Sequence, residues 1–178
     1  MKKYTTKKLE GRQVLDCIQE GTVIDHIPTG KTWEILGVLG LWDYAGTIAV
    51  LRNVESSRYG AKDIIKFDDV ERDVSLVGLF SPKPASTAGE EGDAKGQITV
   101  SRIKGTKVIE KTWPSPVEKV KNVIRCKNPR CITSSEQEID QVFSLAQPEP
   151  PVYRCRYCQA DVHEWKINNP TNEKFGGK

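Results

Sequence analysis

The sequence predicts an α+β protein in which an antiparallel sheet with two helices is followed by a small all-β domain. Short β-branched segments dominate the first two thirds of the chain, interrupted by two segments with helical spacing. The stretch Trp-Pro-Ser-Pro at 113–116 then forms a stiff, extended connector. After it come four of the five cysteines, in two pairs. The 178 residues leave room for two small domains.

The first domain is expected to span residues 13–112, after a mobile basic tail at 1–12. Its expected order is strand, helix, strand, strand, helix, strand, strand. This order is typical of ferredoxin-like α/β sandwiches, in which the helices cover one face of an antiparallel sheet. Apolar and β-branched runs predict strands at 14–20, 46–54, 62–67, 97–104 and 106–111, with an extended stretch at 22–28.

The two helices are predicted at 31–42 and 73–80. In the first, the apolar residues Trp33, Ile35, Leu36 and Leu39 recur at helical rather than alternating spacing. The second follows Asp73, a residue type that caps helices, and ends before Pro82. Residues 82–96 contain no large apolar side chain and many Pro, Gly and charged residues. We therefore expect a flexible surface insertion there.

The four clustered cysteines predict a metal centre. Cys126 and Cys131 are separated by four residues, and Cys155 and Cys158 by two. Each pair can close a short loop whose two sulfurs reach one ion, and two such pairs complete a tetrahedral shell. Four thiolates leave no open position for a substrate, so the prediction is one structural Zn²⁺ per chain.

Other uses of the cysteines remain alternatives. Disulfides suit secreted chains, and nothing here marks the chain for secretion. A redox C-x2-C pair usually opens a helix, whereas a strand-like pattern follows Cys158. His163 is a further candidate ligand, although a surface or strand histidine is the simpler interpretation.

The domain around the cysteines, residues 117–167, is expected to depend on its metal for folding. Short strands are predicted at 123–124, 142–145, 152–153 and 162–165. So few apolar residues build only a weak core, and metal binding then supplies folding free energy. Residues 168–178 are expected to form a C-terminal tail.

Charged residues of the first domain suggest an anion site. Lys62 and Lys66 are four apart in a predicted strand and so share a face, and Lys111 ends the last strand. Together with His26 they would suit a polyphosphate, although lysines at strand ends are often merely solvated. Asp25 and His26, being adjacent on an extended segment, are expected to point to opposite sides and cannot form a catalytic dyad. Glu110 would weaken anion binding beside Lys111.

Composition restricts the function classes. No apolar stretch approaches the roughly 20 residues of a membrane span, so a cytoplasmic protein is expected. The net charge of +3 gives little support for nucleic-acid binding. A zinc-ribbon nucleic-acid binder remains an alternative because four cations cluster near the cysteines, namely Lys127, Arg130, Arg154 and Arg156. Acidic residues between and after the cysteine pairs offset them.

Several segments, taken in order, resemble the regulatory chain of aspartate carbamoyltransferase. They are EGTVIDHIP at 20–28, GAKDIIKF at 60–67, VSRIKGTKVIEK at 100–111, NVIRCKNPRC and YRCRYC. The resemblance covers about residues 12–167 and includes both cysteine spacings.

The resemblance implies a non-catalytic subunit of pyrimidine biosynthesis. Its first domain would form a homodimer and bind ATP, CTP and UTP, and its zinc domain would dock on the catalytic chain, joining two catalytic trimers through three regulatory dimers. His26 and Lys111 would lie toward the phosphates, and Asp25 and Lys66 nearer the ribose and base. The remaining nucleotide contacts implied by the resemblance are Lys62, Leu15, Asp16, Ile18, Val23, Ile103 and Val108.

Overall fold

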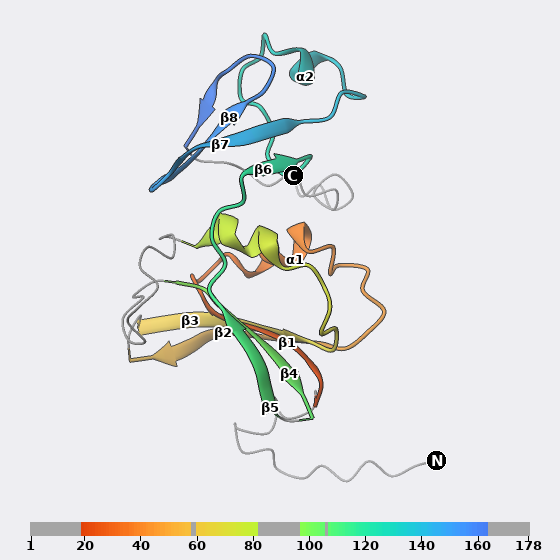
Figure 1. Ribbon diagram of the computed structural model, residues 1–178, viewed down its shortest axis with the longest axis vertical. Helices are drawn as coiled ribbons and strands as arrows, with labels where there is room; N and C mark the ends of the chain where they lie inside the picture. The colour runs from red at the N-terminus through yellow and green to blue at the C-terminus, as the bar shows by residue number, and fades with distance from the viewer. Residues whose placement is uncertain (1–18, 58–59, 82–96, 106, 164–178) are drawn as a thin grey trace, which may run out of the picture.

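The computed structural model describes residues 19–57, 60–81, 97–105 and 107–163, which form two antiparallel sheets (Figure 1). The first sheet and its helices comprise β1 (Gly21–Ile27), α1 (Thr32–Val38), β2 (Ile48–Ser56), β3 (Gly60–Phe67), η2 (Ser75–Phe80), β4 (Thr99–Lys104) and β5 (Lys107–Thr112). The second part comprises β6 (Lys119–Lys121), α2 (Ile132–Ser135), β7 (Val142–Pro148), β8 (Pro151–Cys155) and β9 (Asp161–Val162). The α+β prediction is confirmed.

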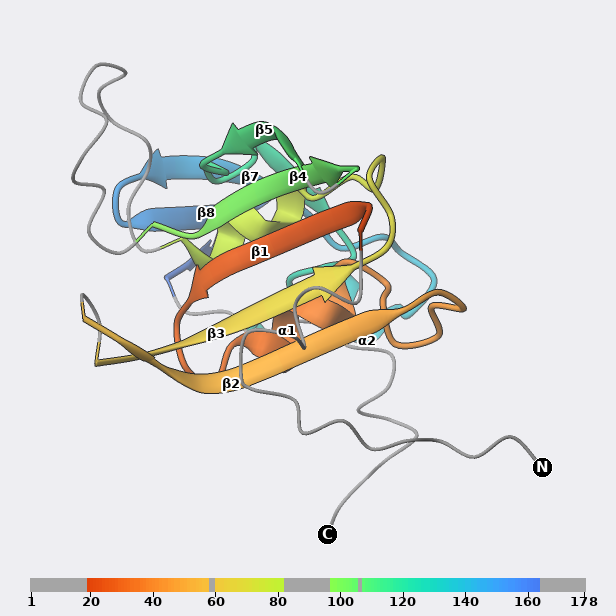
Figure 2. The same ribbon diagram turned by 90° about the horizontal axis from the view of Figure 1, so that it is seen from below.

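The first sheet has the strand order β2-β3-β1-β4-β5, and each neighbouring pair is antiparallel. Its first four strands have the arrangement of a split β-α-β fold, in which β3 lies between β2 and β1. Figure 2 shows the five strands side by side, with α1 behind them. Both α1 and η2 cover the same face, and Ile24, Ile65 and Phe67 are fully buried beneath them. The opposite face carries no helix among the described residues; we call it the helix-free face.

The second sheet has the order β6-β7-β8-β9 and much shorter strands. Its core consists of Val120, Ile124, Phe143, Tyr153 and Val162, all at most 2% exposed. These apolar residues belong to the same buried cluster as the cysteine sulfurs. The cysteines therefore complete a core that the short strands leave small.

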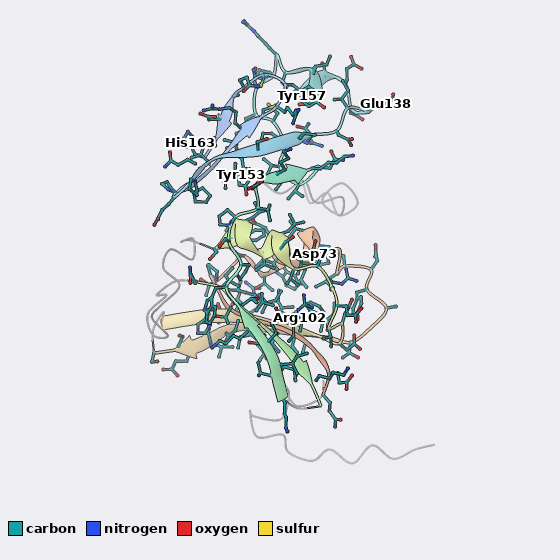
Figure 3. The ribbon with its side chains drawn as sticks, in the orientation of Figure 1. Asp73, Arg102, Glu138, Tyr153, Tyr157 and His163 are labelled. Atoms are coloured by element: carbon teal, nitrogen blue, oxygen red, sulfur yellow. The ribbon has the colours of Figure 1, made fainter. Side chains whose placement is uncertain are left out.

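A short connector joins the two sheets through close contacts on both sides. A Cβ added to Gly78 in η2 would lie only 1.9 Å from the carbonyl oxygen of Ser115, so the connector backbone touches the helix directly. On the other side, the Tyr153 hydroxyl donates to the Val117 carbonyl at 2.7 Å. Tyr153 lies on the side of the second sheet nearest the first domain (Figure 3). The connector is thus held by both parts of the molecule.

Several predicted elements differ in the structure. The first helix is shorter than 31–42 because the chain turns at Gly40 with a φ of 62°. The second is a 3₁₀ helix; Asp73 accepts from the Ser75 N–H at 2.9 Å, but Val74 holds the cap position. A strand at 123–124 was wrong: the strand is Lys119–Lys121, and Ile124 makes an isolated bridge.

Other predictions lie wholly or largely outside the described residues. They are the tails at 1–12 and 168–178, the insertion at 82–96 and most of the strand at 14–20. Of that strand, only residues 19–20 are described, and they form a bend. Among the residues that are described, no helix is long and apolar enough to cross a membrane.

Candidate functional site

The four predicted cysteine ligands converge in the second domain. Their sulfur atoms all lie within 4.8 Å of one another. The Cys126 and Cys158 sulfurs are 3.6 Å apart, and those of Cys131 and Cys155 are 3.8 Å apart. In a tetrahedral tetrathiolate centre with metal–sulfur bonds of about 2.3 Å, sulfurs lie about 3.8 Å apart. The residues therefore fit a bound metal ion.

Local backbone turns aim each sulfur inward. Amide groups two or three residues downstream donate to three of the sulfurs: Asn128 to Cys126, Cys158 and Tyr157 to Cys155, and Ala160 to Cys158. The fourth sulfur, that of Cys131, contacts the hydroxyl of Thr133 at 3.2 Å, again two residues downstream. Such N–H···S bonds stabilise thiolates and orient them toward a metal.

The local environment shifts the pKa values of the cysteine thiols in different directions. Burial raises the pKa of Cys126 to about 12 and also raises the pKa of Cys155. The hydrogen bond from Ala160 lowers the pKa of Cys158 to about 7. Metal binding therefore has to displace protons from the buried thiols, and a cation compensates the charge that this creates.

The geometry weakens the alternatives considered for these cysteines. Cys126, Cys131, Cys155 and Cys158 are free rather than disulfide-bonded. The residues after Cys155 form a turn leading to β9, not the helix expected of a redox pair. His163 is not part of the metal-binding group found among the described residues. Arg154, one of the four clustered cations, is held by Asp161 through two bonds of 2.6 and 3.0 Å.

The helix-free face of the first sheet brings most of the predicted anion-binding residues together. Strand register aligns Lys66 with Val23, Val23 with Ser101, and Ser101 with Lys111, in one row across β3, β1, β4 and β5. Residues two apart in a strand share a face, so Lys62 belongs to this face too. Lys66 is only 5% exposed. Two lysines thus lie in one row and a third beside it.

Asp25 and His26 occupy one end of this face in a way the sequence did not predict. A β-bulge between Ile24 and Ile27 places His26 at a φ of 62°. Its N–H donates to the Asp25 carboxylate at 2.6 Å, and its Nδ1 lies 3.6 Å from the same carboxylate. Asp25 also pairs with Lys62 at 2.8 Å. The expectation that these neighbours point to opposite sides was wrong because it assumed a regular strand.

The remaining predicted residues are distributed as follows. Ile103 pairs with Val108 across β4 and β5, and Val108 is 60% exposed. Leu15, Asp16 and Ile18 lie outside the described residues. Glu110 does not lie beside Lys111 on the helix-free face. It lies opposite Arg102 on the neighbouring strand and contacts the Arg102 guanidinium at 3.1 Å. That guanidinium also donates a hydrogen bond to the Arg72 carbonyl near the helices.

Sequence reasoning missed Asp63, a fully buried carboxylate that points to the helix side of β3. It accepts hydrogen bonds from the Thr32 hydroxyl and from the N–H groups of Gly30 and Asn53. Burial alone would raise the pKa of Asp63, but these bonds, with Arg52 nearby, outweigh burial and lower it. The signal in the sequence was an acidic residue directly before two isoleucines, within a predicted strand. Asp63 ties the start of α1 to β2 and to β3, the strand that carries two of the lysines.

The fold and the cysteine cluster define a two-part α+β protein with a metal-binding domain at its C-terminal end. Family models for the aspartate carbamoyltransferase regulatory chain match both parts: the allosteric domain at residues 13–87 and the metal binding domain at 118–168. The chain belongs to the family of aspartate carbamoyltransferase regulatory chains, and it is therefore a regulatory rather than a catalytic subunit.

Similar regulatory chains come from distant organisms. The one from Bifidobacterium longum is 38% identical over 145 residues, which cover 82% of this chain and 95% of the relative. That of Clostridium tetani is 40% identical over 79% of this chain and 90% of its own length. That of Methanothermobacter thermautotrophicus is 32% identical over 85% of this chain and 90% of its own length. The similarity therefore spans both domains.

Proposed function

We propose that the chain binds nucleoside triphosphates (ATP, CTP and UTP) on the helix-free face and transmits their presence to the catalytic chain through a zinc domain. The observation that carries this proposal is the row containing Lys66 and Lys111, with Lys62 beside it. A sheet face that carries three lysine side chains suits a polyphosphate, for which point charges suffice.

The proposed roles follow the position along this face. His26 and Lys111 contact the phosphates, whereas Asp25 and Lys66 lie nearer the ribose and base. Lys62 holds Asp25 in place through their ion pair. Val23, Ile103 and Val108 line the remainder of the site, together with Leu15, Asp16 and Ile18 from the N-terminal segment.

The metal is proposed to be one structural Zn²⁺ per chain. Four thiolates in a closed tetrahedral shell are typical of zinc sites whose role is to hold a fold together. In this division of the chain, residues 13–112 bind nucleotide, 113–116 connect, and 117–167 form the zinc domain that docks on the catalytic chain.

The proposed assembly contains two catalytic trimers joined by three regulatory homodimers, in the cytoplasm, where it serves pyrimidine biosynthesis. A nucleotide bound far from the active site acts only through different affinities for two global states. Such coupling is typically about 1–3 kcal/mol. The connector contacts at Gly78 and Tyr153 offer a physical link between the two domains.

Removing one lysine charge tests the nucleotide site. Lys111→Gln is expected to weaken CTP and ATP binding by roughly 10–100-fold, because a charge-assisted hydrogen bond contributes about 1.5–3 kcal/mol. The measurement is isothermal titration of the full chain at fixed ionic strength.

Lys104→Gln is the matched control for this experiment. It removes the same charge from the same hairpin, but at a position whose side chain lies on the opposite face from Lys111. It is expected to change nucleotide affinity little. Equal losses in the two variants, or no nucleotide binding by the unmodified chain, would contradict the proposal.

A further inference from the structure

Gln141 is a buried polar residue that neither the metal ligands nor the nucleotide proposal accounts for. It lies immediately before β7 and is 9% exposed. Its side-chain oxygen accepts from the Cys126 N–H at 3.0 Å, and its side-chain nitrogen donates to the Thr133 carbonyl at 2.7 Å. Only one orientation of the amide satisfies both partners, because one needs an acceptor and the other a donor.

These two partners flank the Cys126–Cys131 loop. Cys126 begins the loop and is itself a ligand. Thr133 follows Cys131 by two residues, and its hydroxyl contacts the Cys131 sulfur at 3.2 Å. One side chain therefore spans both ends of the loop that carries half of the metal shell.

The backbone around Gln141 is fixed as well. The Gln141 N–H donates to the Asn122 side chain at 2.8 Å, and the Asn122 N–H donates to the Gln141 carbonyl at 2.8 Å. The next residue, Val142, accepts from the Arg156 N–H at 3.0 Å, inside the loop of the second cysteine pair. Residues 141 and 142 thus contact both halves of the metal centre.

We propose that Gln141 is a positioning residue of the metal centre, which keeps the Cys126–Cys131 loop closed and thereby slows loss of the metal. The proposal rests on the metal site described above. For the ion to leave, Cys126 and Cys131 must move apart from Cys155 and Cys158. That movement breaks both bonds of the Gln141 amide and leaves buried backbone groups unpaired, which is unfavourable. Groups that hold metal ligands in this way typically change metal affinity by about 10–100-fold when replaced.

The test compares Zn²⁺ release from the full chain into an excess of a chromogenic chelator. Gln141→Met keeps the side-chain size but removes both hydrogen bonds, and we expect release about 10–100-fold faster than in the unmodified chain. With Co²⁺ in place of Zn²⁺, the visible absorption bands should shift because the sulfur positions are less fixed. Thr133→Val, which removes only the contact to the Cys131 sulfur, should give a smaller acceleration.

Two controls separate positioning from general stability. Gln137→Met replaces an exposed glutamine close by and should leave release unchanged. Val120→Ala creates a cavity in the same core, where Val120 is 2% exposed, and should lower the unfolding temperature while leaving the Co²⁺ bands in place. If Gln141→Met released Zn²⁺ at the unmodified rate, or no faster than Val120→Ala, the proposal would be overturned.

A further variant tests the proposal in case Gln141→Met does not fold with metal. Gln141→Glu keeps an acceptor for the Cys126 N–H and loses the donor to Thr133, so it should hold Zn²⁺ but release it faster than the unmodified chain. An unchanged rate in this variant would also overturn the proposal. Absence of stoichiometric metal in the unmodified chain would instead refute the metal site itself.

Discussion

The two sheets of this protein reach stability by different physical means. The first builds its core from strands of six to nine residues and covers one face with α1 and η2. The second has strands of two to seven residues and joins four cysteines to a small apolar core. We expect a sheet of the first kind to fold by burying apolar area, and one of the second kind to depend on its metal for folding.

Removing the metal should separate the two regions most strongly. Structural zinc centres contribute about 10–16 kcal/mol of apparent binding free energy at neutral pH, and much of it is folding free energy. Stripping the metal with a thiol reagent and chelator is expected to unfold the second sheet, leave the first folded and release the catalytic chain. Amide hydrogen exchange of the two regions and gel filtration of the complex measure this.

Cysteine substitutions provide the matched comparison for metal removal. Cys131→Ser should reproduce the loss of the second sheet. Cys17→Ser removes the one cysteine outside the two pairs and should leave metal content unchanged. Full protection of the second sheet after metal loss would show that its apolar core suffices.

Asp63→Asn should destabilise only the first sheet, by about 1–3 kcal/mol at neutral pH, because it removes a buried charge and replaces one of its two acceptor oxygens with an amide donor. Because folding lowers the pKa of Asp63, its contribution is present above the ordinary carboxyl pKa and is lost as the pH falls through that range to the lower folded value. Urea unfolding at a series of pH values should therefore show the difference between variant and unmodified chain shrinking in acid. A difference that did not depend on pH would assign the effect to packing rather than charge.

Gly78→Ala tests the connection between the two regions rather than the stability of either one alone. The added methyl group would meet the Ser115 carbonyl, so the connector has to shift, at a cost of about 1–3 kcal/mol. We expect two thermal transitions to move apart in calorimetry and the response to nucleotide to weaken. Ser115→Ala, which leaves that carbonyl in place, should do neither; if both variants behaved alike, the close approach would have no role in coupling.

What could be predicted from the sequence depended on local patterns. The four cysteines were found because ligand spacing is encoded in short loops, and the first-domain element order followed from β-branched runs and turns. The row through Lys66 and Lys111 required strand register, which the lysine spacing within one strand could only suggest.

The contacts that escaped prediction are long-range. Asp63 meets Thr32 across 31 positions, and Gln141 meets Cys126 across 15. The bulge at His26 depends on how β1 pairs with β3, and no residue type in that segment indicates a bulge. Such features arise only when the sheet has assembled, so the hydrophobic periodicity of the sequence does not predict them.

The outermost strand of the first sheet has a further consequence for handling the protein. Every residue of β5 is exposed, and one side of its backbone has no neighbouring strand in the described sheet. The exposed side chains of Val108 and Ile109 would favour pairing of this edge with strands of other chains. The charges of Lys107 and Lys111, on either side of them, disfavour such pairing. Lys111 thus favours solubility in addition to its proposed role in nucleotide binding. Replacing it with an apolar residue would promote aggregation, which could be mistaken for loss of regulation.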